Sequence, residues 1–151
     1  YVDTAVAAIS FGATVEDLQY LDFSYSPLFG TPITAINLSA IVLVNKMNDV
    51  FSTISSKELY GIMNNSNVQI IDVRSKEEYA LSHIPNSKNI EYLELIKPNE
   101  LIDRNSNIYL VCDTVKRTYI ALRYLEYYGY SDVKVLDGGL LMWPYQKVSN
   151  Y

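Results

Sequence analysis

The stretch IYLVCDTVKRTYIALRYLEYYG, residues 108–129, decides the fold of this 151-residue chain. Its first four residues form an apolar run that predicts a short buried strand, and apolar residues recur at helical spacing near its end. Between them stands Cys112, the single cysteine, with Arg117 five positions later. Cys112 is therefore either a buried core thiol or a nucleophile at the mouth of a helix, and its position alone favours neither interpretation.

The turn that follows this strand is suited to an anion. The first N–H groups of a helix have no partner within the helix, and with the helix dipole they create positive potential at its start. Lys116 and Arg117 add positive charge beside Cys112. We therefore expect a lowered pKa for the Cys112 thiol, and a hollow that accepts a sulfur anion such as a persulfide.

Outward from this stretch, short apolar runs alternate with segments of helical spacing. The alternation predicts an α/β fold in which helices flank a mainly parallel sheet, with sites at the carboxyl ends of the strands. The predicted strands are 68–73, 87–92, 108–111 and 133–136. The predicted helices are 55–65 (begun by Ser55 or Ser56), 75–83 (stopped by Pro85), one closed by Gly129 with the buried stripe Ile120, Ala121, Tyr124, Leu125 and Tyr128, and a short one that leads into Trp143.

The sequence pattern of residues 1–50 differs from the regular alternation in the rest of the chain. Thr14 is predicted to cap a helix over TVEDL (14–18), and a second helix is predicted at 36–46. A Pro/Gly-rich patch, YSPLFGTP (25–32), lies between them. The segment holds too little for a core of its own. We therefore expect one end of another domain here, and interpret the chain as a piece of a longer protein.

Composition argues against several classes of function. The net charge of −5 disfavours a nucleic-acid partner, because phosphate contacts need clustered Lys and Arg. The longest apolar run, AIVLV at 40–44, is far too short for a membrane span. A single cysteine makes no internal disulfide, and no Cys/His cluster has metal-ligand spacing. These features predict a cytoplasmic protein with no metal, no membrane and no nucleic-acid partner.

Three motifs, in order, resemble those of rhodanese-like sulfurtransferase domains. The first is IDVRSKEEYALSHIPNSKNI (71–90), with its Asp-Val-Arg, Glu-Tyr, His-Ile-Pro and Asn-Ile. The second is the loop from Cys112 to Arg117, and the third is VKVLDGGLLMW (133–143), with paired glycines before Trp. The resemblance covers about residues 51–147 and implies the rhodanese-like parallel sheet flanked by helices.

The resemblance implies a function for Cys112. This residue would take sulfane sulfur from a persulfide, polysulfide or thiosulfate donor, and would pass it, through its own persulfide, to a thiol acceptor. The backbone amides of the following loop would cradle the terminal sulfur. That substrate-binding loop is Asp113, Thr114, Val115, Lys116 and Arg117.

The length of the loop separates two chemistries. Cysteine phosphatases resemble Cys-x5-Arg, whereas four residues separate Cys112 from Arg117, so the ring is one residue tighter. This favours sulfur transfer over the third alternative, an arsenate or phosphate ester enzyme. The negative charge of Asp113 should disfavour dianionic thiosulfate and suit a less charged persulfide or polysulfide.

Three positions depart from the family pattern. Val115 stands where the family usually has Gly, and Val resists a positive φ, so the loop is expected to be either reshaped or strained. Ser82 and Asn86 replace the glycines around His-Ile-Pro, and Asn tolerates left-handed backbone. A strained loop would suit the alternative function, a catalytically weak module kept for docking or regulation.

Several polar residues allow two interpretations. His83 is either a general base for the cysteine or a structural residue at the following turn. Asp72 and Arg74 either line and support the pocket or form a structural ion pair. Arg117 either contacts the substrate or pairs with a strand-end acid, Asp72 or Glu78.

Residues 1–46 resemble the end of the dimerisation domain of FAD-dependent pyridine nucleotide–disulfide oxidoreductases, in the coenzyme A–disulfide reductase and NADH oxidase group. The matching positions are Thr14 to Leu18, Tyr25, Pro27, Phe29 and Asn37. The resemblance implies a homodimeric parent that reduces coenzyme A disulfides, persulfides or polysulfides with FAD and NAD(P)H. This chain has no Gly-x-Gly-x-x-Gly motif and is expected to bind neither cofactor.

The same resemblance implies partners for the site. Tyr25 would reach the reductase site of the other subunit in the dimer. The sulfur acceptor would be coenzyme A or another small thiol, or the reductase domain of the same protein.

Overall fold

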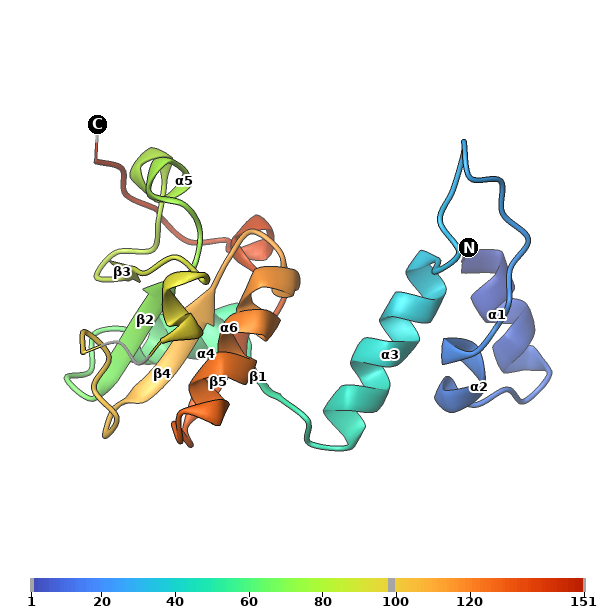
Figure 1. Ribbon diagram of the computed structural model, residues 1–151, viewed down its shortest axis with the longest axis horizontal. Coiled ribbons are helices and arrows are strands. Elements are labelled where there is room, and N and C mark those ends of the chain that lie inside the picture. Colours follow the sequence, from blue (N-terminus) through green and yellow to red (C-terminus); the bar gives the residue numbers. More distant parts are fainter. Residues whose placement is uncertain (1, 98–99, 151) are drawn as a thin grey trace. The chain divides into compact units, whose positions relative to one another are not determined.

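The computed structural model describes residues 2–97 and 100–150, and the chain divides into two compact units, residues 1–50 and 51–151 (Figure 1). Residues 51–151 form an α/β unit whose described strands make one parallel sheet, in the order β1-β5-β4-β2-β3. The strands are β1 (Ser52–Ile54), β2 (Val68–Asp72), β3 (Lys88–Asn89), β4 (Asn107–Val111) and β5 (Val133–Leu136). The helices are α4 (Ser56–Ile62), α5 (Lys76–Leu81) and α6 (Val115–Tyr127), with the short 3₁₀ turns η1 (Glu94–Ile96) and η2 (Leu140–Met142). The predicted parallel sheet flanked by helices is confirmed.

The central strand β4 divides the core into two halves, because successive side chains of a strand point to opposite faces. Ile108 and Leu110 belong to the cluster that contains the buried side of α6, which lies along the sheet in Figure 1. Tyr109 and Val111 belong to the cluster that contains α4 and η2. Cys112 continues the alternation and therefore faces the α6 side of the sheet.

Local sequence explains where the helices begin. Ser55 and Ser75 each form a capping box with the glutamate three positions on, Glu58 and Glu78, as the first of these motifs predicted. Helix α5 ends at Leu81, because the next residue is already extended. It therefore ends slightly earlier than predicted, and proline is not what stops it.

Strand β1 and the buried face of α6 differ from the prediction. Strand β1 was not predicted. It has three residues, of which only Ile54 is buried, so its sequence contains no apolar run. The buried residues of α6 are Thr118, Ala121, Leu122 and Leu125. Ile120, predicted to be buried, is partly exposed. The polar Thr118 can lie on the buried face, because its hydroxyl donates a hydrogen bond to the Val115 carbonyl at 2.8 Å.

The described helices of residues 1–50 are α1 (Val2–Ser10), α2 (Val15–Gln19) and α3 (Ala35–Met47). Thr14 caps α2 as predicted, through a capping box with Asp17. Among the described residues of this unit, the buried ones are Thr34, Ile36, Asn37 and Ala40. So few buried side chains agree with the expectation that this segment has no core of its own.

Asn37 of α3 holds this small unit together. Its side-chain amide donates to the backbone carbonyls of Leu18 and Leu21, at 3.2 and 2.9 Å. Its side-chain oxygen accepts hydrogen bonds from the backbone N–H and the hydroxyl of Thr34. One buried amide thus joins the end of α2 to the start of α3.

Candidate active site

Cys112 is the first residue after β4, at the carboxyl end of the central strand, and it is fully buried. The turn after β5 holds its backbone, because the Leu140 N–H donates to the Cys112 carbonyl at 2.7 Å. Gly139 lies against the same peptide with φ at 62°, and a Cβ built there would stand 2.4 Å from the Asp113 backbone oxygen. Glycine at this position therefore lets the two loops meet and fixes the backbone on which the thiol is carried.

The loop from Cys112 into α6 forms without a left-handed residue. Thr114 is the N-cap, with extended backbone, and Val115 is the first residue of α6. Among the described residues other than glycine, positive φ occurs only at Asp49 and Asn86. Of the two expectations for Val115, left-handed strain is therefore absent, because this residue has the ordinary backbone of a helix. Asn86 does adopt the left-handed backbone that asparagine tolerates.

A buried ion pair supports this loop. The Arg74 guanidinium donates to both Asp72 carboxylate oxygens, at 2.7 to 3.1 Å, and to the Ser82 carbonyl at 2.6 Å. Its remaining nitrogen, Nη1, donates to Asp113 Oδ1 at 3.0 Å. Burial alone would lower the pKa of Arg74, but the hydrogen bonds and charges of Asp72 and Asp113 outweigh it, so the pKa is raised. Asp72 and Arg74 thus form the structural ion pair that was one of their two interpretations, and Arg74 also reaches the loop.

A second ion pair joins the start of α6 to α5. Arg117 Nη1 and Nη2 donate to the two carboxylate oxygens of Glu78, at 2.6 and 2.8 Å. These hydrogen bonds lower the pKa of Glu78 to about 2, and the same pairing raises the pKa of Arg117. Arg117 Nη2 also lies 3.7 Å from Asp113 Oδ2. Of the two acids predicted for Arg117, the structure selects Glu78.

The lowered pKa of Glu78 predicts a dependence of stability on pH. A carboxyl group with a pKa near 2 in the folded chain and near 4.5 when unfolded stabilises the fold above pH 4.5, and this contribution is lost as the pH falls toward 2. We expect Glu78→Gln to be less stable than the natural chain at neutral pH, and the two to converge toward pH 2. Urea midpoints measured by Trp143 fluorescence between these pH values test this. A stability difference between the two chains that stays constant from neutral pH to pH 2 would contradict the lowered pKa of Glu78.

The predicted lowering of the Cys112 pKa is wrong for this structure. Burial raises the pKa of the thiol above its ordinary 9.0, and the Thr114 backbone and the Arg117 guanidinium act in the opposite direction without outweighing burial. The prediction counted the positive charges of the loop. It did not include the fully buried position of the sulfur. The resting cysteine is therefore a neutral thiol near pH 7.

The site as a whole is a buried cysteine between a central parallel strand and a helix start, with an arginine five positions on. A family model described as a rhodanese-like domain matches residues 55–144, which is more than half of the chain. The chain belongs to the rhodanese-like family. A curated relative of this rhodanese-like chain, the thiosulfate sulfurtransferase GlpE of Pseudomonas paraeruginosa, is 30% identical over 97 residues, which cover 64% of this chain and 87% of that protein.

Two solved structures match nearly the whole rhodanese-like chain. The reduced CoADR-RHD of Bacillus anthracis is 31% identical with a TM-score of 0.86, and the match covers 93% of this chain. A NAD-dependent persulfide reductase from A. fulgidus is 30% identical with a TM-score of 0.79, and the match covers 94% of this chain. The matches cover 25% of each of those two longer chains.

The structural interpretation is favoured for His83 of the rhodanese-like unit. Its Nδ1 lies 2.8 Å from the Tyr79 carbonyl oxygen, and its ring stacks on the Tyr79 ring with centroids 3.8 Å apart. Its backbone pairs with Val148 in both directions, at 2.8 and 2.9 Å. These contacts fix the C-terminal segment against the end of α5, and none of them involves Cys112.

The remaining predicted residues lie apart from the cluster around Cys112. Lys116 is exposed on the first turn of α6. Tyr25 belongs to the other unit, in the irregular segment between α2 and α3, and is half exposed, so its role at a partner's site stays a prediction. Within residues 2–97 and 100–150, no helix is both long and apolar enough to cross a membrane, and no group of His, Cys, Asp and Glu is arranged to hold a metal.

Two residues that shape the rhodanese-like site have roles that the sequence did not predict. Gly139 touches the backbone of the cysteine loop, and the signal for it was the paired glycines after β5. Ser82 accepts a hydrogen bond from Arg74 through its backbone carbonyl. A backbone acceptor leaves no signal in the sequence, because any residue supplies one.

Proposed function

We propose that the rhodanese-like unit is a sulfurtransferase in which Cys112 carries sulfane sulfur as a persulfide. The observation that supports this most is the position of Cys112, at the carboxyl end of the central strand and just before the start of α6. The first N–H groups of α6 have no partner within the helix, so they suit a sulfur anion beside them. The likeness to a thiosulfate sulfurtransferase adds support.

The transfer consists of two displacements at sulfur. The neutral thiol of Cys112 first loses its proton to water, because the thiolate is the nucleophile. The thiolate attacks the outer sulfur of a donor R–S–SH, an Sγ–S bond forms, the S–S bond of the donor breaks, and its electron pair leaves with R–S⁻. An acceptor thiolate R′–S⁻ then attacks the outer sulfur of the Cys112 persulfide and becomes R′–S–SH. The Cys112 thiolate leaves with the electron pair, and no external oxidant or reductant is consumed.

In this proposal, the residues around Cys112 stabilise charge and hold the loop. The Thr114 backbone and the Arg117 guanidinium both favour the thiolate, since both oppose the rise of its pKa. Asp72 and Arg74 act as positioning residues. They hold the loop because Arg74, fixed by Asp72, donates a hydrogen bond to Asp113 and not to the thiol. Val115 contributes its backbone as the first residue of α6.

Mass spectrometry of the intact chain tests this function. After incubation with glutathione persulfide and removal of excess donor, we expect a gain of about 32 Da, the mass of one sulfur atom, on Cys112. Addition of coenzyme A should return the mass to its starting value and yield coenzyme A persulfide. Cys112→Ser should show no gain, because serine forms no persulfide. No gain on the natural chain from persulfide, polysulfide or thiosulfate would overturn the proposal.

The alternative is a catalytically weak module kept for docking or regulation. The observation that favours it is the fully buried thiol, whose pKa is raised above its ordinary value. The mass experiment separates the two functions, since a docking module would take up no sulfur.

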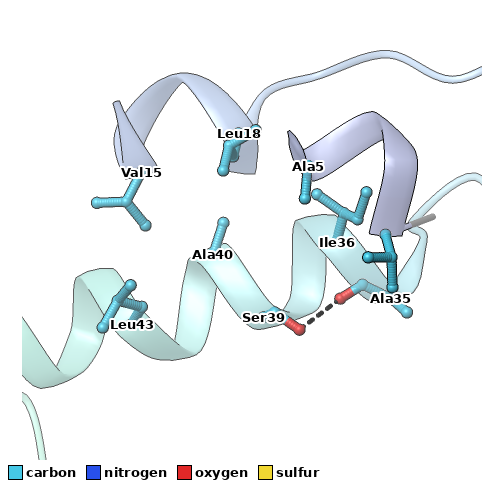
Figure 2. A pocket seen from close by; sticks show the side chains of 9 residues that line it. Ala5, Val15, Leu18, Ala35, Ile36, Ser39, Ala40 and Leu43 are labelled. Carbon is cyan, nitrogen blue, oxygen red and sulfur yellow. Dashed lines mark hydrogen bonds between the residues drawn. The ribbon is translucent and has the colours of Figure 1, made fainter. Parts of the chain in front are cut away.

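We further propose that the rhodanese-like unit serves a reductase domain of the same parent protein, of the coenzyme A disulfide, persulfide or polysulfide class. The support lies in residues 1–50, where α1, α2 and α3 border an open apolar hollow of about 360 Å³. Figure 2 shows the side chains that line it. Side chains that line it include Ala5, Val15, Leu18, Ile36 and Leu43. The two similar reductase structures extend far beyond the region that matches this chain. The proposal includes a homodimeric, cytoplasmic parent in which Tyr25 reaches the partner's site.

FAD and NAD(P)H belong, in this proposal, to a region of the parent outside this chain. The hollow of residues 1–50 is lined by Val, Ala, Leu and Ile with a single Ser, whose hydroxyl already donates to the Ala35 carbonyl. It offers no charged side chain for a pyrophosphate and does not fit a dinucleotide. No step of the sulfur transfer above passes through either cofactor.

A further inference from the structure

The ion-pair network around Cys112 contains one more carboxylate than guanidinium groups. Asp72 takes three hydrogen bonds from the Arg74 guanidinium, and Glu78 binds Arg117 through both of its terminal nitrogens. These two pairs are balanced, one carboxylate to one guanidinium. Asp113 is a third carboxylate, shared between Arg74 at 3.0 Å and Arg117 at 3.7 Å. The network of three acids and two arginines therefore carries a net charge of −1 beside the thiol.

The acids of this network together withhold both arginines from a ligand, and Asp113 takes Nη1 of Arg74. Every side-chain nitrogen of Arg74 has a protein acceptor: Nε and Nη2 reach Asp72, Nη2 also reaches the Ser82 carbonyl, and Nη1 reaches Asp113. The terminal nitrogens of Arg117 are held by Glu78. A guanidinium binds an oxyanion through such paired N–H groups, so neither arginine is free to clamp one.

Asp113 is the acid of this network that an incoming sulfur donor meets. It follows Cys112 directly in the chain, and its side chain is 37% exposed, whereas the Asp72 side chain is fully buried. Glu78 is similarly exposed, at 35%, but it lies on α5 and both of its oxygens bind Arg117. A dianion such as thiosulfate is repelled by this carboxylate more than a donor with one negative charge. Lys116 is exposed to solvent on α6, where water and salt screen its charge.

We infer that Asp113 is the specificity-determining residue of the site and selects persulfide donors, whose reacting –S–S(H) group carries at most one negative charge, over dianionic thiosulfate. The inference rests on the proposed sulfur transfer and assigns the donor class to it. Asp113 acts in two ways, through its own charge and by engaging Nη1 of Arg74.

Two reagents that differ by one charge test this at Cys112, the single cysteine, without any sulfur transfer. Iodoacetamide is neutral and iodoacetate is an anion, and both alkylate the thiolate. In Asp113→Asn we expect the ratio of the iodoacetate rate to the iodoacetamide rate to rise about tenfold, because one repulsive charge is gone and Arg74 Nη1 is released. The rise should shrink in about 1 M salt, where charges are screened within about 3 Å. The ratio of sulfur loading from thiosulfate to loading from glutathione persulfide should rise in parallel.

Glu126→Gln is the matched control. It also removes one carboxylate charge that is paired with an arginine, in Arg123–Glu126 at 2.6 Å, but near the far end of α6, so both ratios should stay unchanged. An unchanged alkylation ratio in Asp113→Asn, an equal change in Glu126→Gln, or a thiol that neither reagent reaches in the folded chain would overturn the inference. If Cys112 takes up sulfur but neither ratio changes in Asp113→Asn, the inference about Asp113 is wrong and the proposed sulfur transfer stands. A changed alkylation ratio with no loading from any donor defeats the proposed function and leaves charge selection by Asp113 standing.

Discussion

Replacing Arg74 by methionine is expected to lower the free energy of unfolding of the rhodanese-like unit by about 3–5 kcal/mol. Methionine keeps much of the length of the side chain but removes the guanidinium. The Asp72 carboxylate, which is fully buried, would then remain in the core without a cation. The Ser82 carbonyl and Asp113 would lose a hydrogen-bond donor at the same time. Urea unfolding followed by Trp143 fluorescence reports on this unit, because Trp143 is the single tryptophan and is buried within it.

Arg123→Met is the matched control for this variant. Arg123 also pairs with a carboxylate, Glu126, but its side chain is half exposed, so the loss should be below about 1 kcal/mol. The double variant Asp72→Asn/Arg74→Met removes the orphaned charge as well, and we expect it to recover part of the stability. Equal losses for Arg74→Met and Arg123→Met would contradict the role given to the buried pair.

Gly139→Ala is the second change with a large expected effect, a loss of about 2–4 kcal/mol together with the loss of sulfur loading at Cys112. An alanine at φ 62° is strained, and its Cβ would stand 2.4 Å from the Asp113 carbonyl oxygen and 2.7 Å from that of Cys112. Backbone atoms cannot rotate away as a side chain can. The loop that carries Cys112 must therefore move, and the hydrogen bond from Leu140 N–H to the Cys112 carbonyl is expected to break.

Gly129→Ala separates the strain of a left-handed alanine from the collision with the loop. Gly129 has φ 81°, and the nearest atom to its added Cβ is a side-chain nitrogen of Arg104 at 3.7 Å. We expect a loss of about 1 kcal/mol and normal sulfur loading at Cys112. If Gly139→Ala and Gly129→Ala show the same free energy of unfolding and the same sulfur loading at Cys112, the close approach of the two loops is not needed for the function of the site.

Elements with a continuous apolar run, or with a side chain that caps its own helix, were predictable. β2, β4 and β5 were predicted as strands because buried parallel strands are apolar on both faces. The caps Thr14 and Ser55 were predicted because each donor and acceptor lies within three residues of the other. The position of Cys112 at a strand end followed from the same local pattern.

Elements that depend on distant partners were not predictable. β1 has one buried residue, so its pairing with β5 is visible only once β5 is in place. The buried face of α6 turns toward Thr118, whose burial depends on a hydroxyl that finds its own acceptor. The choice of Glu78 for Arg117 depends on where α5 is packed, because the two residues lie 39 positions apart.

The sequence by itself determined the α/β order of the rhodanese-like unit, the place of Cys112 after a buried strand and the tight spacing to Arg117, because all three depend on residues close together in the chain. The protonation state of the cysteine and the charge around it were decided by the tertiary structure alone. Burial raises the pKa of Cys112 against the loop charges, and Asp72, Glu78 and Asp113 engage both arginines. Desolvation and ion pairing depend on distances in space, which the linear order of residues does not contain.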